Sequence, residues 1–300
     1  MPRFFHPDTP DLPLPPGHRF PAGKYRLLRD RISHEGILGR ATLVPSPAAG
    51  RADLERAHTP GYVAAILDGT VSADIQRRIG LPWSPVLVAR SRATVGGSLA
   101  AAREALDHGI SGQLAGGTHH AHADFGSGYC TFNDLAVAAL TLLDEGRVAS
   151  VAIVDCDVHQ GDGNAAILTR DPRALVVSVH GEKNFPFRKV PSDLDVGLPD
   201  GTEDRAYLHA LAEAMETVAA FRPEIVLYLS GADPLASDTL GRLALTFDGL
   251  AERDRFVLEH CRRRGVPVSI AIGGGYAQPI GDSVTAYANT FRVAAELFGL

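Results

Sequence analysis

The sequence predicts a doubly wound α/β fold, in which a mostly parallel sheet carries helices on both faces. Strand-length apolar segments alternate with helix-length segments along the whole 300-residue chain. The strand segments are continuous apolar runs, which is typical of parallel strands that are covered on both faces. No shift in composition divides the chain, so we expect a single domain over residues 1–300.

The predicted elements follow from apolar runs, helical periodicity and the turn residues between them. Strands are expected where short apolar runs end at glycine or polar residues, at 41–44, 113–116, 151–155, 174–180, 224–230 and 268–274. Helices are expected at 91–107, 133–145, 163–169, 204–221, 247–264 and 283–298. The segment 181–201 is polar and broken by proline, so we expect a long loop, which in a compact domain is often functional.

Composition is that of an ordinary globular protein, with 45% hydrophobic and 21% charged residues. The net charge is −6 and no basic block is present, so no nucleic-acid partner is expected. No apolar run reaches membrane-spanning length, and the N-terminus has too many prolines and acids for a signal sequence. The three cysteines are widely spaced and fit a reducing compartment. We therefore expect a cytoplasmic protein without a membrane partner.

Polar side chains follow the predicted strands repeatedly, at the point where each strand ends. They lie in the segments 116–120, 155–162, 230–233 and 273–276, and at His180. In open α/β sheets, ligands bind outside the carboxyl ends of the strands. One polar strand end could arise by chance, but this repetition predicts a functional site at that edge.

The segment from Val151 to Gly163, VAIVDCDVHQGDG, is the most informative part of the chain. Its apolar run leads directly into acidic residues and a histidine, although buried unpaired charge is costly. On an extended chain Asp157 and His159 point to the same side, where they offer an oxygen and a nitrogen to a divalent metal such as zinc. For an isolated D-x-H pattern, a capped strand end followed by a polar turn is the alternative.

Asp233 ends another apolar strand and is the expected third metal ligand. Its alternative role is a helix N-cap before Pro234. Three protein ligands leave a coordination position open for water, which is typical of a catalytic metal. Such an ion lowers the pKa of bound water from about 15.7 towards about 7.

His119 and His120 are adjacent and follow a double glycine, close to the predicted metal centre. General acid–base catalysis needs groups that titrate near neutrality, and each histidine needs a carboxylate that sets its tautomer. Asp155 and Asp162 are the available carboxylates. A structural hydrogen-bonding histidine is the alternative, and no role is assigned to His122.

Tyr276 follows three glycines and could donate a hydrogen bond to a carbonyl oxygen as negative charge builds on it. A tyrosine packed on a glycine-rich turn is the alternative. Tyr129, in the turn 126–134, could line an apolar channel, and Phe185 or Phe187 could face it. Core packing remains the competing explanation for all three aromatic residues.

Taken together, these motifs resemble the zinc-dependent histone deacetylase family, which shares its fold with arginase. HH (119–120), GYCTFND (128–134), DxDxHxGDG (155–163), GAD (231–233) and GGGY (273–276) occur in the family's order. The segment HRFPAGKYRLLRDRI (18–32) and the compact length are similar to the class IV branch and its bacterial relatives.

The resemblance implies a role for each matching residue. Zn²⁺, or Fe²⁺ in its place, would be bound by Asp157, His159 and Asp233. His120 would be the general base and then the acid, assisted by Asp162, while His119 paired with Asp155 would be its electrostatic partner. Tyr276 would polarise the acyl carbonyl.

Two further sites are implied by the resemblance alone. The acyl-lysine tunnel would be lined by Gly128, Tyr129, Phe185 and Gly274. A structural K⁺ would be held by Asp155, Asp157, His159, Ser178 and Val179. Asp238 matches a further family acid whose role does not follow from the sequence. Gln160 departs from the family, since many members have a second histidine there.

We therefore expect a zinc-dependent hydrolase that removes acyl groups from lysine ε-amino groups of proteins or peptides. A deacetylase of small amines such as acetylpolyamines is the main alternative, and Glu182, Asp193 and Asp195 in the long loop could form the acidic gate that it needs. A two-manganese ureohydrolase would need further bridging aspartates. A silent acyl-lysine binding module is disfavoured because every catalytic position is filled. Oligomeric state cannot be inferred from the sequence.

Overall fold

One eight-stranded sheet forms the centre of the computed structural model, which describes residues 1–300. The strands are β1 (Arg3–His6), β2 (Thr42–Pro45), β3 (Ile110–Gln113), β4 (Val151–Asp155), β5 (Ala174–Gly181), β6 (Leu194–Leu198), β7 (Ile225–Gly231) and β8 (Val268–Gly273). Their order is β2-β1-β3-β8-β7-β4-β5-β6, and every neighbouring pair is parallel. The predicted doubly wound sheet is therefore confirmed, with all strands parallel.

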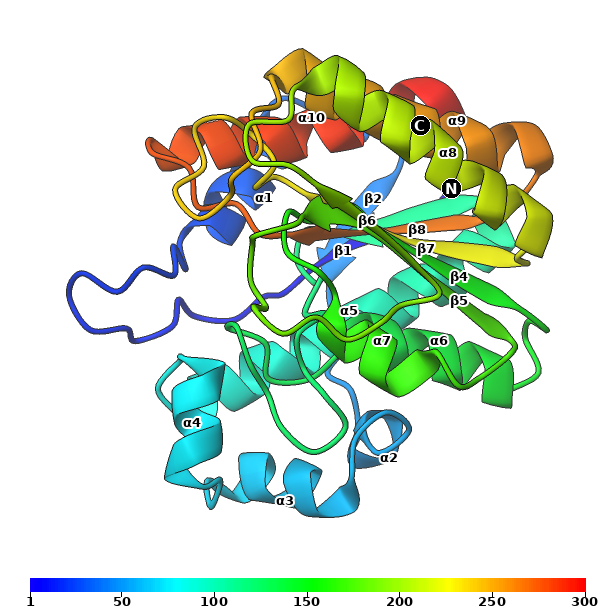
Figure 1. The fold of residues 1–300 in the computed structure, drawn as a ribbon. Helices are drawn as coiled ribbons and strands as arrows, with labels where there is room; N and C mark the ends of the chain where they lie inside the picture. Colours follow the sequence, from blue (N-terminus) through cyan, green and yellow to red (C-terminus); the bar gives the residue numbers. More distant parts are fainter.

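Helices cover both faces of the sheet, as Figure 1 shows. One layer contains α1 (Lys24–His34), α8 (Asp204–Phe221), α9 (Phe247–Arg264) and α10 (Ile280–Phe298). The other contains α5 (Pro85–His108), α6 (Asp134–Asp144) and α7 (Asp162–Leu168), with α2 (Arg51–Leu54), α3 (Pro60–Asp68) and α4 (Ala73–Ile79) lying beyond it. No helix combines the length and the apolar composition that crossing a membrane requires.

The continuous apolar strands are explained by the two hydrophobic cores, one on each face of the sheet. Along β4, Ala152 and Val154 pack in the core beneath α8, α9 and α10, whereas Val151 and Ile153 pack in the core above α5 and α6. Because successive side chains point to opposite faces, both kinds of position must be apolar.

Three features of the sheet differ from the sequence prediction. β1 was not predicted, and β6 lies inside the segment expected to be a long loop. β6 is an edge strand that pairs only with β5 and alternates exposed with partly buried residues, so it lacks the continuous apolar signal. β3 ends at Gln113 rather than spanning 113–116, because the chain leaves the sheet at Gly116 and Gly117, which both have positive φ.

The strand order determines where the polar strand ends meet. β3, β8, β7 and β4 are consecutive neighbours in the sheet. All run in the same direction, so the loops that follow them emerge side by side at one edge. The segments 116–120, 155–162, 231–238 and 273–276 therefore converge there.

Candidate active site

Asp157, His159 and Asp233 lie together at the ends of β4 and β7, as the sequence predicted. Their ligand atoms all lie within 4.8 Å of one another, and all three residues are buried. His159 Nδ1 is 2.9 Å from Asp157 Oδ1 and 3.1 Å from Asp233 Oδ2. One imidazole cannot neutralise two buried carboxylates, whereas a divalent cation among the three donors would. The mixed oxygen and nitrogen donor set fits a first-row divalent ion.

The local backbone that brings these ligands together is not the extended strand that we expected. β4 ends at Asp155, and the following residues form a turn. The amide of His159 donates to Asp157 Oδ1 at 2.9 Å, and the amide of Val158 donates to Asp233 Oδ1 at 2.9 Å. Asp233 caps no helix. The carboxylates therefore shape the turn themselves, and through it they hold the metal-binding group in place.

Two buried histidine–aspartate pairs stand beside this cluster. His119 Nδ1 is 2.7 Å from Asp155 Oδ2, and His120 Nδ1 is 2.6 Å from Asp162 Oδ1. This is the pairing that the family resemblance implies. Asp162 also contacts His122 Nε2 at 3.0 Å, so His122 is part of the site's hydrogen-bond network rather than an isolated residue.

The surroundings of the two histidines separate their pKa values. Burial and the neighbouring His119 lower the pKa of His120 to about 3, so its imidazole is neutral at neutral pH. Burial also lowers the pKa of His119, but the carboxylates of Asp155 and Asp157 outweigh burial and raise it to about 9. His120 is therefore the unprotonated member of the pair, and its free ring nitrogen is available as a base.

Asp134 holds the loop that carries both histidines. Its fully buried carboxylate accepts hydrogen bonds from the amides of Gly117 and Thr118, at 3.1 and 2.7 Å, and from the Thr118 hydroxyl at 2.6 Å. Asn133 caps α6 directly before it. The sequence predicts a helix start here, but the positioning role of Asp134 is visible only in the structure.

The Tyr276 loop is held by two further residues. Asp238 Oδ2 accepts a hydrogen bond from the Tyr276 amide at 2.6 Å, which gives this acid a structural role. Lys24, only 1% exposed, donates to the carbonyls of Gly274 and Gly275. Its ammonium lies 4.9 Å from the centre of the Tyr276 ring. A side chain at Gly274 would overlap the Asp233 carboxylate, so this position requires glycine.

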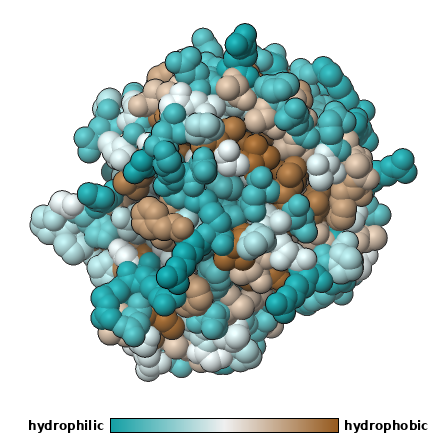
Figure 2. Space-filling model, in the orientation of Figure 1, coloured by the Kyte–Doolittle hydropathy of each residue, from teal (hydrophilic) through white to brown (hydrophobic).

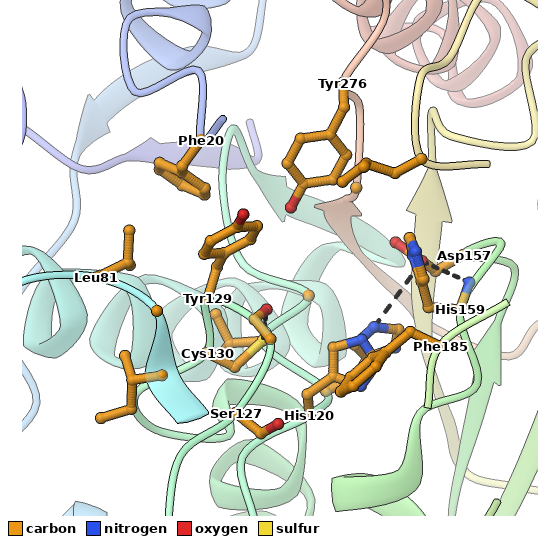
Figure 3. Close-up of a pocket in the computed structure, with 18 of the residues that line it drawn as sticks. Phe20, Leu81, His120, Ser127, Tyr129, Cys130, Asp157, His159, Phe185 and Tyr276 are labelled. Atoms are coloured by element: carbon orange, nitrogen blue, oxygen red, sulfur yellow. Dashed lines mark hydrogen bonds and ion pairs between the residues drawn. The ribbon is translucent and has the colours of Figure 1, made fainter. Parts of the chain in front are cut away.

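A cavity of about 790 Å³ connects these groups to the surface. All four predicted tunnel residues line it. The Phe185 ring packs edge-on against His120, with ring centres 4.9 Å apart, and the Tyr129 and Tyr276 ring centres lie 6.0 Å apart (Figure 3). A side chain at Gly128 would overlap His120 and crowd Phe185. Phe187 is 86% exposed at the rim. On the face drawn in Figure 2, apolar residues gather near the middle among hydrophilic ones.

Gln160, which departs from the family pattern, stabilises the loop that carries Phe185. Its side-chain amide donates to the Val190 carbonyl at 2.8 Å and to Asp195 Oδ1 at 2.7 Å. Its carbonyl accepts from the Val190 amide at 3.1 Å. The glutamine therefore joins the turn after β4 to the loop before β6.

The cavity wall is basic rather than acidic. Asp157 is the only acid that lines it, whereas five cationic residues do: Arg19, Arg78, Arg90, Lys183 and Arg242. None of the three acids Glu182, Asp193 and Asp195 lines the cavity: Asp193 accepts a hydrogen bond from the Val176 amide of β5, and Asp195 accepts from the Gln160 side chain and the Ser192 amide. The acidic gate considered for a polyamine substrate is therefore absent.

The expected K⁺ site remains a prediction. Asp155 and Ser178 are register partners on β4 and β5, and the Ser178 hydroxyl is 3.0 Å from His180 Nδ1. Val179 is buried next to them.

A buried ion pair on α9 supports both metal-binding turns from beneath. Arg253, 1% exposed, donates to the carbonyls of Cys156 and Gly231, at 3.2 and 2.6 Å. Asp254 balances its charge at 2.8 Å and also accepts a hydrogen bond from the Tyr228 hydroxyl. One guanidinium thus joins the ends of β4 and β7 directly before their metal ligands.

Arg253→Lys should therefore weaken metal binding. A lysine keeps the charge but has no planar fork that reaches both carbonyls at once. We expect the metal dissociation constant to rise about 10-fold or more, as loss of outer supports typically causes, measured by competition with a chromophoric chelator. Arg255→Lys, at the surface of the same helix, is the control; equal affinities in the two variants would contradict the prediction.

A parallel sheet whose strand ends assemble a metal-binding cluster, two histidine–aspartate pairs and a tyrosine in one cavity defines a hydrolase-type centre. Residues 18–291 match the family description "Histone deacetylase domain". The chain belongs to the histone deacetylase family, and it is accordingly a hydrolase of the metal-dependent kind.

Similar proteins agree with this assignment. The chain is 44% identical over 299 residues to an uncharacterized protein of Picosynechococcus sp., covering 99% of each. It is 29% identical to histone deacetylase 2 of Arabidopsis thaliana, covering 89% of this chain and 73% of the relative. The crystal structure of the HDA15 HD domain superposes with a TM-score of 0.80 at 22% identity, covering 99% and 88% of the two chains, and shows the same fold.

Proposed function

We propose that this protein is a zinc-dependent hydrolase that removes acyl groups from the ε-amino group of lysine in proteins or peptides. The observation that carries the proposal is the buried His120, which is paired with Asp162 at 2.6 Å and lines the same cavity as Asp157, His159 and Tyr276. Family membership supports deacetylase chemistry. Cytoplasmic location and the absence of a nucleic-acid partner remain expectations from the sequence.

Each side chain of the site has its own role in the proposed reaction. Zinc held by Asp157, His159 and Asp233 would supply Lewis acidity toward water and the acyl carbonyl, and Fe²⁺ suits the same donors. His120 takes a proton from the attacking water, with Asp162 fixing its tautomer. The water oxygen bonds to the acyl carbon, the carbon–nitrogen bond breaks, and His120 returns the proton to the lysine amine.

Tyr276 and the cavity walls bind the acylated lysine side chain. The Tyr276 hydroxyl donates to the carbonyl oxygen as charge develops on it. Burial raises the pKa of Tyr276 well above its usual value, so it remains a donor. Gly128, Tyr129 and Phe185 enclose the aliphatic lysine stem. This follows from their position in the cavity and from the apolar character of that stem.

The test is turnover of the zinc-loaded protein on lysine peptides that carry acyl chains from acetyl to myristoyl. Release of free lysine peptide, followed by mass spectrometry, is expected, and the preferred chain length reports the depth of the cavity. The metal-stripped protein is the control. A zinc-loaded protein that leaves every peptide intact would contradict the proposal.

We expect peptides to be preferred over acetylated polyamines. A polyamine carries positive charge into a cavity lined by five cationic residues and a single acid. Like-charge contacts oppose binding, so kcat/KM for acetylputrescine should be at least about 10-fold below that for an acetyl-lysine peptide. Added salt screens these contacts and should reduce the difference in kcat/KM between the two substrates. A better rate on acetylputrescine would instead establish a small-amine deacetylase.

A further inference from the structure

Arg90 is a buried cation without a protein counter-charge. It lies on α5 and is 9% exposed, yet its side chain makes no hydrogen bond and no ion pair with the protein. Its guanidinium stacks over the Tyr25 ring, 4.1 Å from the ring centre. A cation–π contact offsets only part of the cost of burying a charge.

The Arg90 side chain lines the same cavity as His120 and Tyr276. A series of cation–π contacts links it to the Tyr276 loop, since the Tyr25 ring contacts Arg90 on one side and the Lys24 ammonium, at 5.1 Å, on the other, and Lys24 lies 4.9 Å from the Tyr276 ring. Lys24 is occupied by the two glycine carbonyls and is 3.5 Å from the Tyr287 hydroxyl. Arg90 is therefore the cation in this region whose donors are free.

A second side chain near Arg90 also has an unpaired polar group. Thr94 lies one turn further along α5, lines the cavity and has no side-chain hydrogen bond to the protein. The only acid in the cavity wall, Asp157, is already paired with His159. A planar guanidinium with free donors in a partly desolvated cavity matches a carboxylate, which it can bind through two parallel hydrogen bonds.

We propose that Arg90 recognises a carboxylate at the far end of the acyl chain, so that the protein favours lysine acylated by a dicarboxylic acid, such as succinyl- or glutaryl-lysine. This specificity rests on the proposed lysine-deacylase function. Hydrolysis of succinyl-lysine consumes one water, breaks the amide carbon–nitrogen bond and releases lysine and succinate. The distal carboxylate takes no part in the bond changes and only binds.

The experiment compares succinyl-lysine with valeryl-lysine in one peptide, because the two chains have similar length and differ in the terminal charge. In Arg90→Met the ratio of kcat/KM for succinyl to valeryl should fall about 10- to 100-fold, as expected for a lost charge-assisted hydrogen bond. Arg90→Lys should recover part of that ratio. Arg103→Met is the matched control, since Arg103 lies on α5 and pairs with Glu145 outside the cavity.

An unchanged succinyl-to-valeryl ratio in Arg90→Met would overturn the proposal. A second contrary result concerns valerate, the product released from valeryl-lysine. If Arg90→Met only weakens inhibition by valerate, Arg90 binds the monocarboxylate product rather than the distal carboxylate, and the proposal is overturned. If the wild-type protein hydrolyses none of the peptides, acetyl-lysine included, the lysine-deacylase function fails. Calorimetric binding of glutarate to the zinc-loaded protein still tests the site: weaker binding in Arg90→Met supports it, and equal binding overturns it.

Discussion

Replacing His120 with alanine should abolish measurable turnover while leaving the metal content intact. His120 is held by Asp162 at 2.6 Å and lines the cavity, but it is not a member of the metal-binding cluster. General acid–base catalysis typically contributes about 10²- to 10⁴-fold, and this residue is proposed to act in both directions of proton transfer. Steady-state kinetics on an acetyl-lysine peptide and elemental analysis of the purified variant measure the two quantities.

His122→Ala is the matched control for this experiment. His122 contacts the same carboxylate at 3.0 Å but does not line the cavity. Its loss should perturb the orientation of Asp162 without removing the base, so the rate should fall much less than in His120→Ala. Metal loss in His120→Ala would indicate a structural histidine, and equal rate losses in the two variants would contradict the assignment of the base.

The metal-binding group could be predicted from the sequence because its members occupy positions where stability alone gives no reason for them. Asp157, His159 and Asp233 follow apolar strands, and parallel topology brings such strand ends to one edge. The extended backbone expected at Asp157 and His159 is nevertheless wrong, because β4 ends at Asp155. The backbone turns after Asp155, so the ligands are not oriented by the alternation of side chains along a strand. They are oriented by hydrogen bonds from the amides of the turn to the carboxylates of Asp157 and Asp233.

The residues that support the site were missed because each stands on a helix, where a charged residue is normally read as solvent-facing. In α9, Leu250, Arg253, Asp254 and Val257 all lie on the buried face. Charges at the i+3 and i+4 positions of an apolar stripe were the available signal. Lys24 occupies the same kind of position before Leu28 and Ile32 on α1.

The missed strands have a different cause. β6 is an edge strand whose sequence LDVGL alternates partly buried with exposed positions, and β1 is only four residues long. Both lie in proline-containing segments whose apolar signal is weak. Their pairing is determined by neighbouring strands distant in the sequence, such as β3 for β1, and these contacts cannot be read from a local window.

Tyr276→Phe should lower kcat about 10²- to 10³-fold, the usual cost of removing one donor to a developing oxyanion. The substitution removes only the hydroxyl, so the loop geometry should persist through the Asp238 contact with the backbone and the Lys24 contacts with the glycine carbonyls. KM should change little, because the bond to the carbonyl oxygen strengthens chiefly in the transition state.

Tyr129→Phe provides the comparison for this result. Its ring lies 6.0 Å from that of Tyr276 in the same cavity, and its hydroxyl makes no hydrogen bond with the protein. Loss of that hydroxyl should alter KM rather than kcat, because it belongs to the cavity wall.

Burial raises the pKa of Tyr276, so its protonated, donating form persists to higher pH than for an exposed tyrosine. The kcat of the wild-type protein should therefore not fall through ionisation of Tyr276 below about pH 10. An unchanged kcat in Tyr276→Phe would remove this residue from the mechanism and leave oxyanion stabilisation to the metal site alone.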